Sequence, residues 1–173
     1  MSRKGASPVN WPILAIFIFA TLLAAATGAY FRPGQWYRTL AKPAWTPPNW
    51  AFPVAWTIIY AMIASAGYVF TVAATPAERV VPLTVFGIQL ALNAAWSPLF
   101  FGAHRMGWAL ADILVMIVAI AATIVLFTQI SPVSGALLLP YLVWSAFASY
   151  LNYTILRLND PRRRAAIRQS AAG

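Results

Sequence analysis

The polar side chains best suited to binding a ligand lie inside apolar stretches of the chain. Gln89, Asn93 and Trp96 follow helical spacing within residues 80–101, so two amides and an indole share one face of a helix. Polar groups inside a membrane are costly and normally face an interior or a cavity. This face is therefore a candidate ligand-binding surface.

Small side chains occupy the opposite face of the same stretch. Gly87, Ala91 and Ala95 recur every four residues, a spacing that lets two helices approach closely. The stripe indicates either packing within one bundle or a face for a homodimer, and the sequence leaves both open.

Two ionisable residues, Asp112 and His104, are candidates for proton transfer or metal binding. Asp112 is the one acid inside an expected span, which makes it a functional candidate. A proton relay is disfavoured because no second acid or histidine lies in a span, and we expect a structural hydrogen bond instead. His104 is the sole histidine, so no metal or haem site is predicted, because such a site needs further ligands. No catalytic triad, phosphate loop or pair of carboxylates can be assembled.

The last apolar stretch has two distinct faces. Tyr153 and Arg157 lie near one face, and with Leu151 they fit the L/V-x-Y-x-K/R sterol pattern, which is a weak motif. The alternative is an interfacial tyrosine beside an arginine that extends toward the membrane surface. The other face is expected to look into the bundle and carries Tyr141, Trp144, Ala148, Leu151 and Ile155.

A stiff aromatic segment covers residues 42–50, Lys-Pro-Ala-Trp-Thr-Pro-Pro-Asn-Trp. Its prolines remove backbone donors and fix φ, so the segment cannot form a regular helix. It separates two long apolar runs and therefore lies where membrane meets water. Trp45 and Trp50 indicate either a lid over a cavity or an interfacial tryptophan belt.

The elements that must position these groups are membrane helices. Of the 173 residues, 61% are hydrophobic and 9% charged, far below the charged share of a soluble domain. Five stretches are long enough to span a bilayer, and the first is longer than the apolar region of a typical signal peptide, so we expect it to be retained. The expected spans are residues 11–30, 53–74, 80–101, 106–129 and 134–156.

We therefore predict an all-α membrane protein: a bundle of five transmembrane helices with a Pro/Trp-rich loop between the first and second. Residues 1–160 form one membrane domain, and residues 161–173 form a basic, disordered tail. The chain has no cysteine and a net charge of +9, which favours attraction to anionic lipid over nucleic acid.

The basic residues also predict the orientation. Of the 12 Lys and Arg residues, Arg3, Lys4 and Arg79 lie on one side of a five-span bundle and the other nine on the opposite side. Basic residues favour the cytoplasmic side. The C-terminus and the 42–50 loop are predicted to be cytoplasmic, in a membrane that the sequence does not identify.

With these features assembled, the chain resembles the TspO/MBR family, which includes translocator proteins, tryptophan-rich sensory proteins and peripheral-type benzodiazepine receptors. The resemblance covers residues 36–160, while the first span and the tail match poorly. It rests on several motifs in order: Trp36-Tyr37, the 42–50 loop, Gln89-Leu90-Ala91-Leu92-Asn93, Phe100-Phe101-Gly102, Met106-Gly107-Trp108-Ala109-Leu110, Pro140-Tyr141-Leu142-Val143-Trp144 and Leu151-Asn152-Tyr153.

The resemblance implies a multi-pass membrane protein, often a homodimer, that binds porphyrins such as protoporphyrin IX or haem, with no obligatory cofactor. It implies cholesterol or another lipid at Leu151, Tyr153 and Arg157, and a lid formed by the 42–50 loop. Transport or sensing is the expected role. The alternative is a light-dependent porphyrin-degrading enzyme that uses Trp56 and Trp144. The pocket implied by the resemblance comprises Tyr37, Trp45, Trp50, Trp56, Asn93, Trp96, Trp144 and Ala148.

Overall fold

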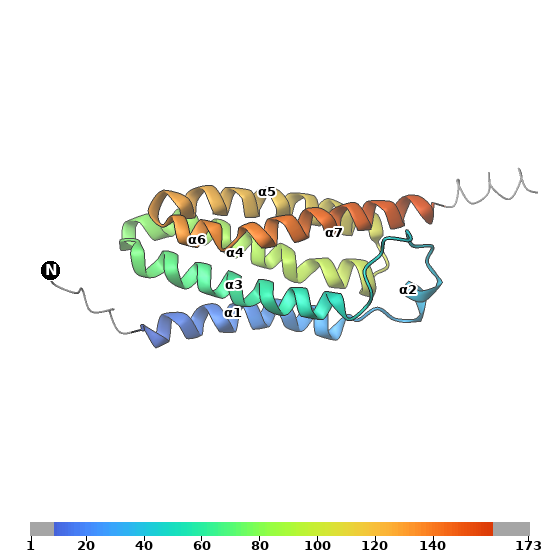
Figure 1. Ribbon diagram of the computed structural model, residues 1–173, viewed down its shortest axis with the longest axis horizontal. Helices are drawn as coiled ribbons and strands as arrows, with labels where there is room; N and C mark the ends of the chain where they lie inside the picture. Colours follow the sequence, from blue (N-terminus) through green and yellow to red (C-terminus); the bar gives the residue numbers. More distant parts are fainter. Residues whose placement is uncertain (1–8, 161–173) are drawn as a thin grey trace, which may run out of the picture.

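The computed structural model of the protein describes residues 9–160, so the predicted tail lies outside the described residues. That part of the chain is helical and holds no strand (Figure 1). The elements are α1 (Trp11–Tyr30), α2 (Gln35–Thr39), α3 (Ala51–Ala73), α4 (Pro76–Ser97), a π-helical turn η1 (Pro98–Gly102), α5 (Met106–Ile130), α6 (Pro132–Ala136) and α7 (Leu139–Leu158).

Five helical segments are long and apolar enough to cross a membrane, so the predicted five-span helical fold is confirmed. The first span has the predicted bounds. The third begins at Pro76 rather than at residue 80, because a capping box precedes it: the backbone N–H and hydroxyl of Thr75 both donate to Glu78 Oε2, each at 2.7 Å. Proline at the first helical position is preorganised for this start.

The fifth span also starts earlier than predicted, at Pro132 rather than residue 134. It consists of α6 and α7, which meet at Leu137 and Leu138. The sequence did not predict this break or the short helix α2. Among the spans, α4 packs along α5, α5 along α7, and α1 against both α3 and α4.

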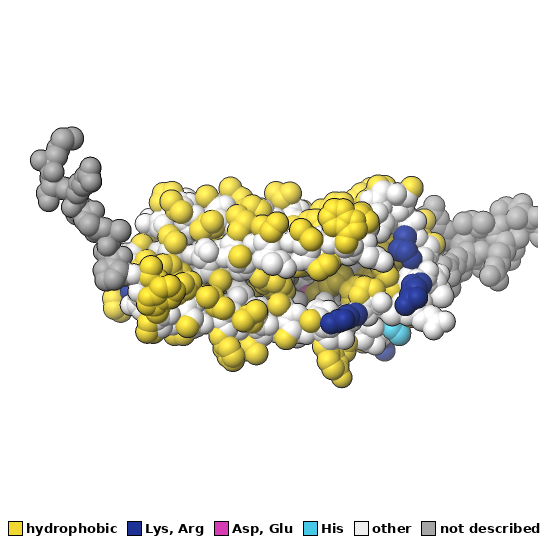
Figure 2. Space-filling view, turned by 60° about the horizontal axis from the view of Figure 1, so that its bottom comes forward, with side chains coloured by type: hydrophobic (Ala, Val, Ile, Leu, Met, Phe, Trp, Pro, Cys, Tyr) yellow, Lys and Arg dark blue, Asp and Glu magenta, His cyan; other side chains and the backbone are white. Residues whose placement is uncertain are grey.

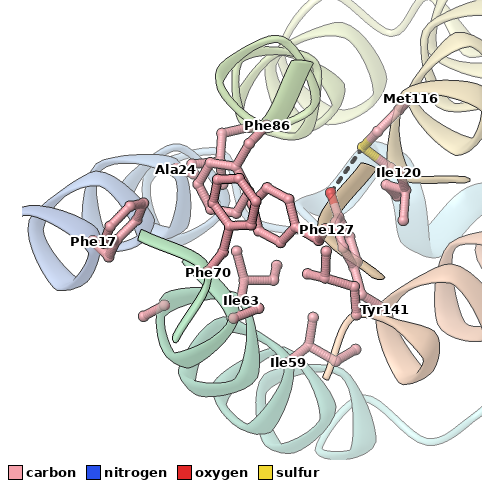
Figure 3. Packing of buried hydrophobic residues seen from close by; sticks show 14 of the residues in the cluster. Phe17, Ala24, Ile59, Ile63, Phe70, Phe86, Met116, Ile120, Phe127 and Tyr141 are labelled. Carbon is pink, nitrogen blue, oxygen red and sulfur yellow. Dashed lines mark hydrogen bonds between the residues drawn. The ribbon is translucent and has the colours of Figure 1, made fainter. Parts of the chain in front are cut away.

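The core away from the 42–50 loop is a stack of phenylalanines (Figure 3). The rings of Phe70 and Phe127 stack at a centroid distance of 4.0 Å, and Phe86 stacks on Phe127 at 5.7 Å. Phe17 meets Phe86 edge-on and lies over Gly67, where an added Cβ would come within 2.4 Å of the Phe17 ring. Glycine is thus required for α1 to approach α3.

The other end of the bundle carries the loop. There α2 and the 42–50 segment, which we call the lid, lie beside the α4–α5 connection and the C-terminal end of α7 (Figure 1). Lysine and arginine side chains gather at this end (Figure 2). The fold therefore places the lid, most of the visible basic surface and the ends of three spans together.

Candidate functional site

A hydrogen-bonded node joins four helices in the bundle interior. Tyr60 of α3 donates its hydroxyl to Asn93 Oδ1 at 2.6 Å, and Asn93 Nδ2 donates to the Tyr141 hydroxyl at 3.0 Å. Tyr141 in turn donates to the sulfur of Met116 on α5 at 3.3 Å (Figure 3). The predicted polar face of the third span points inward, since Gln89 is only 1% exposed. Sequence reasoning missed Tyr60, although it follows Trp56 by one helical turn.

Three tryptophans surround this node, one each from α3, α4 and α7. Trp56 stacks on Tyr60 at 5.3 Å and meets Tyr141 edge-on at 6.2 Å. Trp96 stacks on Phe100 at 5.0 Å. Trp144 meets Phe52 edge-on at 5.9 Å. All three indoles are partly buried, so the interior near the lid is walled by flat aromatic surfaces.

The buried stripe predicted on the fifth span is also present. Tyr141, Leu151 and Ile155 are buried, and Trp144 and Ala148 are partly buried. This side of α7 therefore faces the bundle, as the helical spacing predicted.

The lid tryptophans occupy different environments. The Trp45 ring stacks on Tyr150 of α7 at 5.2 Å and 9°, and it meets Phe147 edge-on at 5.8 Å. Trp50 is 67% exposed at the start of α3. Trp45 therefore packs on the outer side of α7 and stays 43% exposed, and Trp50 faces outward.

A side-chain clamp holds the lid to the end of α7. Asn159 Oδ1 accepts from the Ala41 N–H at 3.0 Å, and Asn159 Nδ2 donates to the Ala41 carbonyl at 2.9 Å. This pairing reproduces the exchange of two hydrogen bonds between strand residues, although the partners are 118 positions apart. Nothing in the sequence pattern predicted it.

Tyr37 and Lys42 fix the segment before the lid. Tyr37 is buried against Phe100 and Phe101, and burial raises the pKa of its phenol. Lys42 Nζ donates to the carbonyls of Tyr37 and Leu40 at 2.8 and 2.9 Å, and it lies 4.8 Å from the centroid of the Tyr37 ring. The Lys42 ammonium thus satisfies backbone carbonyl groups at the end of α2.

A second stack anchors α2 to the α4–α5 connection. The ring of His104 lies on Trp36 at 4.0 Å and 18°. His104 has φ 56°, a left-handed conformation uncommon outside glycine. This tight turn presents the imidazole flat to the indole, so His104 has a packing role in the site.

The predicted sterol motif splits between two faces of α7. Tyr153 is 43% exposed, and the Arg157 guanidinium lies 5.8 Å from its ring centroid. Leu151 is buried beside Ile155. Only the tyrosine and the arginine therefore form an outward surface.

The small-residue stripe lines an external groove. Gly87 and Ala91 are exposed and Ala95 is partly buried. The groove, about 330 Å³ in volume, lies between α1 and α4. A Cβ added at Gly87 would meet nothing within 4 Å. Its lining comprises Ala20, Leu23, Ala24, Gly87, Leu90, Ala91 and Ala94.

The expected structural hydrogen bond of Asp112 is not made at Oδ2. That oxygen is buried without a partner in the described part of the chain. The same holds for the indole N–H groups of Trp96 and Trp144 and for the Ser145 hydroxyl. Within residues 9–160, no group of three His, Cys, Asp or Glu side chains is placed to hold a metal ion.

Comparison with known proteins extends the family match to the first span, which was expected to match poorly. The sequence model described as the TspO/MBR family matches residues 13–158. The chain is 40% identical to the "Tryptophan-rich sensory protein" of Cereibacter sphaeroides over 157 residues, which covers 91% of this chain and 98% of the relative. It is 42% identical to the human "Translocator protein" over 148 residues, covering 83% and 88%. It is 39% identical to "Protein CrtK" of Rhodobacter capsulatus over 148 residues, covering 85% and 92%.

Proposed function

The chain belongs to the TspO/MBR family of multi-pass membrane proteins, and from this premise we propose that it binds porphyrins between the lid and the aromatic interior, for transport or sensing. The observation that carries this proposal is the ring of partly buried indoles, Trp56, Trp96 and Trp144, beneath a lid tryptophan stacked on α7. Flat aromatic side chains bind flat apolar ligands by stacking and area burial.

Charge supports a defined orientation of such a ligand. Arg38 and Arg105 are exposed at the lid end, where they attract the carboxylates of a porphyrin without entering the apolar interior. Lys42 already donates hydrogen bonds to three backbone carbonyls. It therefore attracts the porphyrin carboxylates from a distance rather than contacting them. The macrocycle then lies against the indoles, with its propionates toward the lid.

The test is equilibrium binding of protoporphyrin IX and of haem, followed by quenching of tryptophan fluorescence. We expect Trp144→Leu to weaken binding at least about fivefold, since a buried aromatic contact contributes about 1–3 kcal/mol. Trp108→Leu is the matched control, because Trp108 is 67% exposed. Equal losses in both variants would contradict an interior site. If illumination of the complex yields a new absorbing product that is lost in Trp56→Phe and Trp144→Phe, the protein is a porphyrin-degrading enzyme instead.

We also propose a separate lipid contact on the outside of α7, where Tyr153 and Arg157 offer an aromatic ring and a cation. A sterol or comparable lipid would pack against this surface. Tyr153→Ala should reduce photolabelling by a sterol probe and leave porphyrin binding intact. If Tyr153→Ala abolishes porphyrin binding as strongly as Trp144→Ala, the two sites are not separate.

The groove that contains Gly87 and Ala91, with Ala95 one turn further along the stripe, is proposed as the face of a homodimer. The lid and the C-terminus are proposed to lie on the cytoplasmic side. Gly87→Leu adds a side chain at a position where a Cβ meets nothing within 4 Å. It should convert dimers to monomers in detergent, as measured by light scattering; an unchanged mass rejects this face. A reporter fused at Gly173 checks the orientation.

A further inference from the structure

Three buried polar atoms without partners come from three neighbouring helices: Trp96 Nε1 on α4, Asp112 Oδ2 on α5 and Ser145 Oγ on α7. Ser145 is fully buried. Leaving such groups unpaired costs free energy, and native interiors pair nearly all of them. Each of the three therefore needs an explanation.

The register of the helices brings the three side chains to one level. The node of Asn93, Tyr141 and Met116 fixes α4, α7 and α5 relative to one another. Trp96 lies three residues after Asn93, Ser145 four after Tyr141, and Asp112 four before Met116. Because α4 and α7 run toward the lid and α5 runs away from it (Figure 1), all three steps lead one turn toward the lid.

Two further contacts support this register. Asn152 Nδ2 donates to the Met106 carbonyl at 3.0 Å, which continues the α5–α7 alignment toward the lid. The second is the extended packing of α5 along α7. In Figure 2, a small acidic surface is visible between apolar side chains near the middle of the bundle.

We propose that Trp96, Asp112 and Ser145 form a subsite for the hydroxyl group of an apolar ligand. The indole N–H and the serine O–H are donors, and the carboxyl oxygen is an acceptor. One hydroxyl oxygen accepts two hydrogen bonds and donates one, so a single alcohol group satisfies all three. The subsite lies between the lid and the satisfied node, next to Trp144, and so rests on the interior binding site proposed above.

Other polar groups of a ligand match these three side chains less well than a hydroxyl does. A carboxylate ligand brings no donor and is repelled by Asp112. An ammonium pairs with Asp112 but leaves the donors of Trp96 and Ser145 unsatisfied. A hydroxyl thus matches the two donors and one acceptor of this subsite, and the unpaired indole N–H of Trp144, three residues after Tyr141, remains for a second acceptor on the ligand. A ligand that also carries an anion would be oriented with its hydroxyl inward and its anion toward the basic lid end.

The test uses full-length protein with pyrenemethanol and its methyl ether, two flat aromatic probes that differ in the hydroxyl donor. Binding is followed by energy transfer from tryptophan to pyrene. We expect the native protein to prefer the alcohol by about tenfold, the equivalent of one or two net hydrogen bonds. Asp112→Leu and Ser145→Ala should each reduce the ratio of the two affinities toward one.

Ser149→Ala is the matched control on α7, because the Ser149 hydroxyl already donates to the Ala146 carbonyl at 2.8 Å. It should keep the tenfold ratio. If Asp112→Leu does not fold, Ser145→Ala alone decides. Any one of three results would overturn the proposal: the native protein binds the alcohol and the ether equally well, the preference survives both substitutions, or pyrenemethylamine binds more tightly than the alcohol in a way that depends on Asp112. Porphyrin binding is measured separately. If porphyrin does not bind but the preference for the alcohol remains, only porphyrin as the ligand is rejected.

Discussion

The clamp between Asn159 and Ala41 should control how often the lid opens. Asn159→Ala removes both side-chain hydrogen bonds that hold the lid to the end of α7. It also removes the bond from Asn159 Nδ2 to the Ile155 carbonyl, which lies within α7 itself. The substitution therefore weakens the attachment of the lid to the end of α7, while the stack of Trp45 on Tyr150 remains.

The expected size follows from the exposure of the partners. A hydrogen bond contributes about 0.5–1.5 kcal/mol net, and Ala41 is exposed, so water pairs with its backbone groups once the clamp is gone. We therefore place the two bonds together at about 1–2 kcal/mol, the lower part of their combined range. This corresponds to roughly a 5- to 30-fold increase in the open population of the lid.

Hydrogen exchange at the Ala41 amide measures that population directly, and trypsin cleavage after the exposed Arg38 reports it independently. Both rates should rise in Asn159→Ala by the factor above. Asn152→Ala is the matched control, because Asn152 ties the same helix to Met106 on α5 rather than to the lid. Unchanged exchange in Asn159→Ala, or equal acceleration in both variants, would refute the clamp.

Two other predictions follow from close contacts. Gly67→Ala should destabilise the bundle by about 1–3 kcal/mol through overpacking against Phe17. Gly87→Ala should not destabilise the subunit, because nothing lies within 4 Å of the added Cβ and alanine is the better helix former; thermal unfolding in detergent compares the two. Trp45→Leu should speed porphyrin release several-fold by removing the stack on α7, while Trp50→Leu should not, since Trp50 is largely exposed; equal release rates would show that stacking does not hold the lid.

The spans and their inward faces could be predicted because hydropathy and helical spacing are local properties of the chain. Gln89 and Asn93 were placed correctly for that reason, since each must avoid lipid. The early start of α4 also had a local signal, because Thr75 and Glu78 have the spacing of a capping box, and reading the span from hydropathy alone missed it.

Other features depend on contacts between distant residues. The clamp joins Ala41 and Asn159 across almost the whole chain, and no periodicity encodes such a pair. The division of the sterol motif between two faces required the orientation of α7, which buries Leu151 and exposes Tyr153. The weak pattern could not distinguish an inward leucine from an outward one.

Buried polar groups without partners are distributed unevenly between the lid half of the bundle and the opposite half. Seven residues in the described chain carry such buried atoms, and five of them, Trp96, Asp112, Trp144, Ser145 and Asn152, lie on the lid side of the Asn93 node. The other two, Thr71 and Gln89, lie in the opposite half, whose core is built from stacked phenylalanines. Because unpaired groups destabilise a closed interior, the lid half gains most from a ligand or from water. The phenylalanine half supplies the rigid packing on which the helices that present those groups depend.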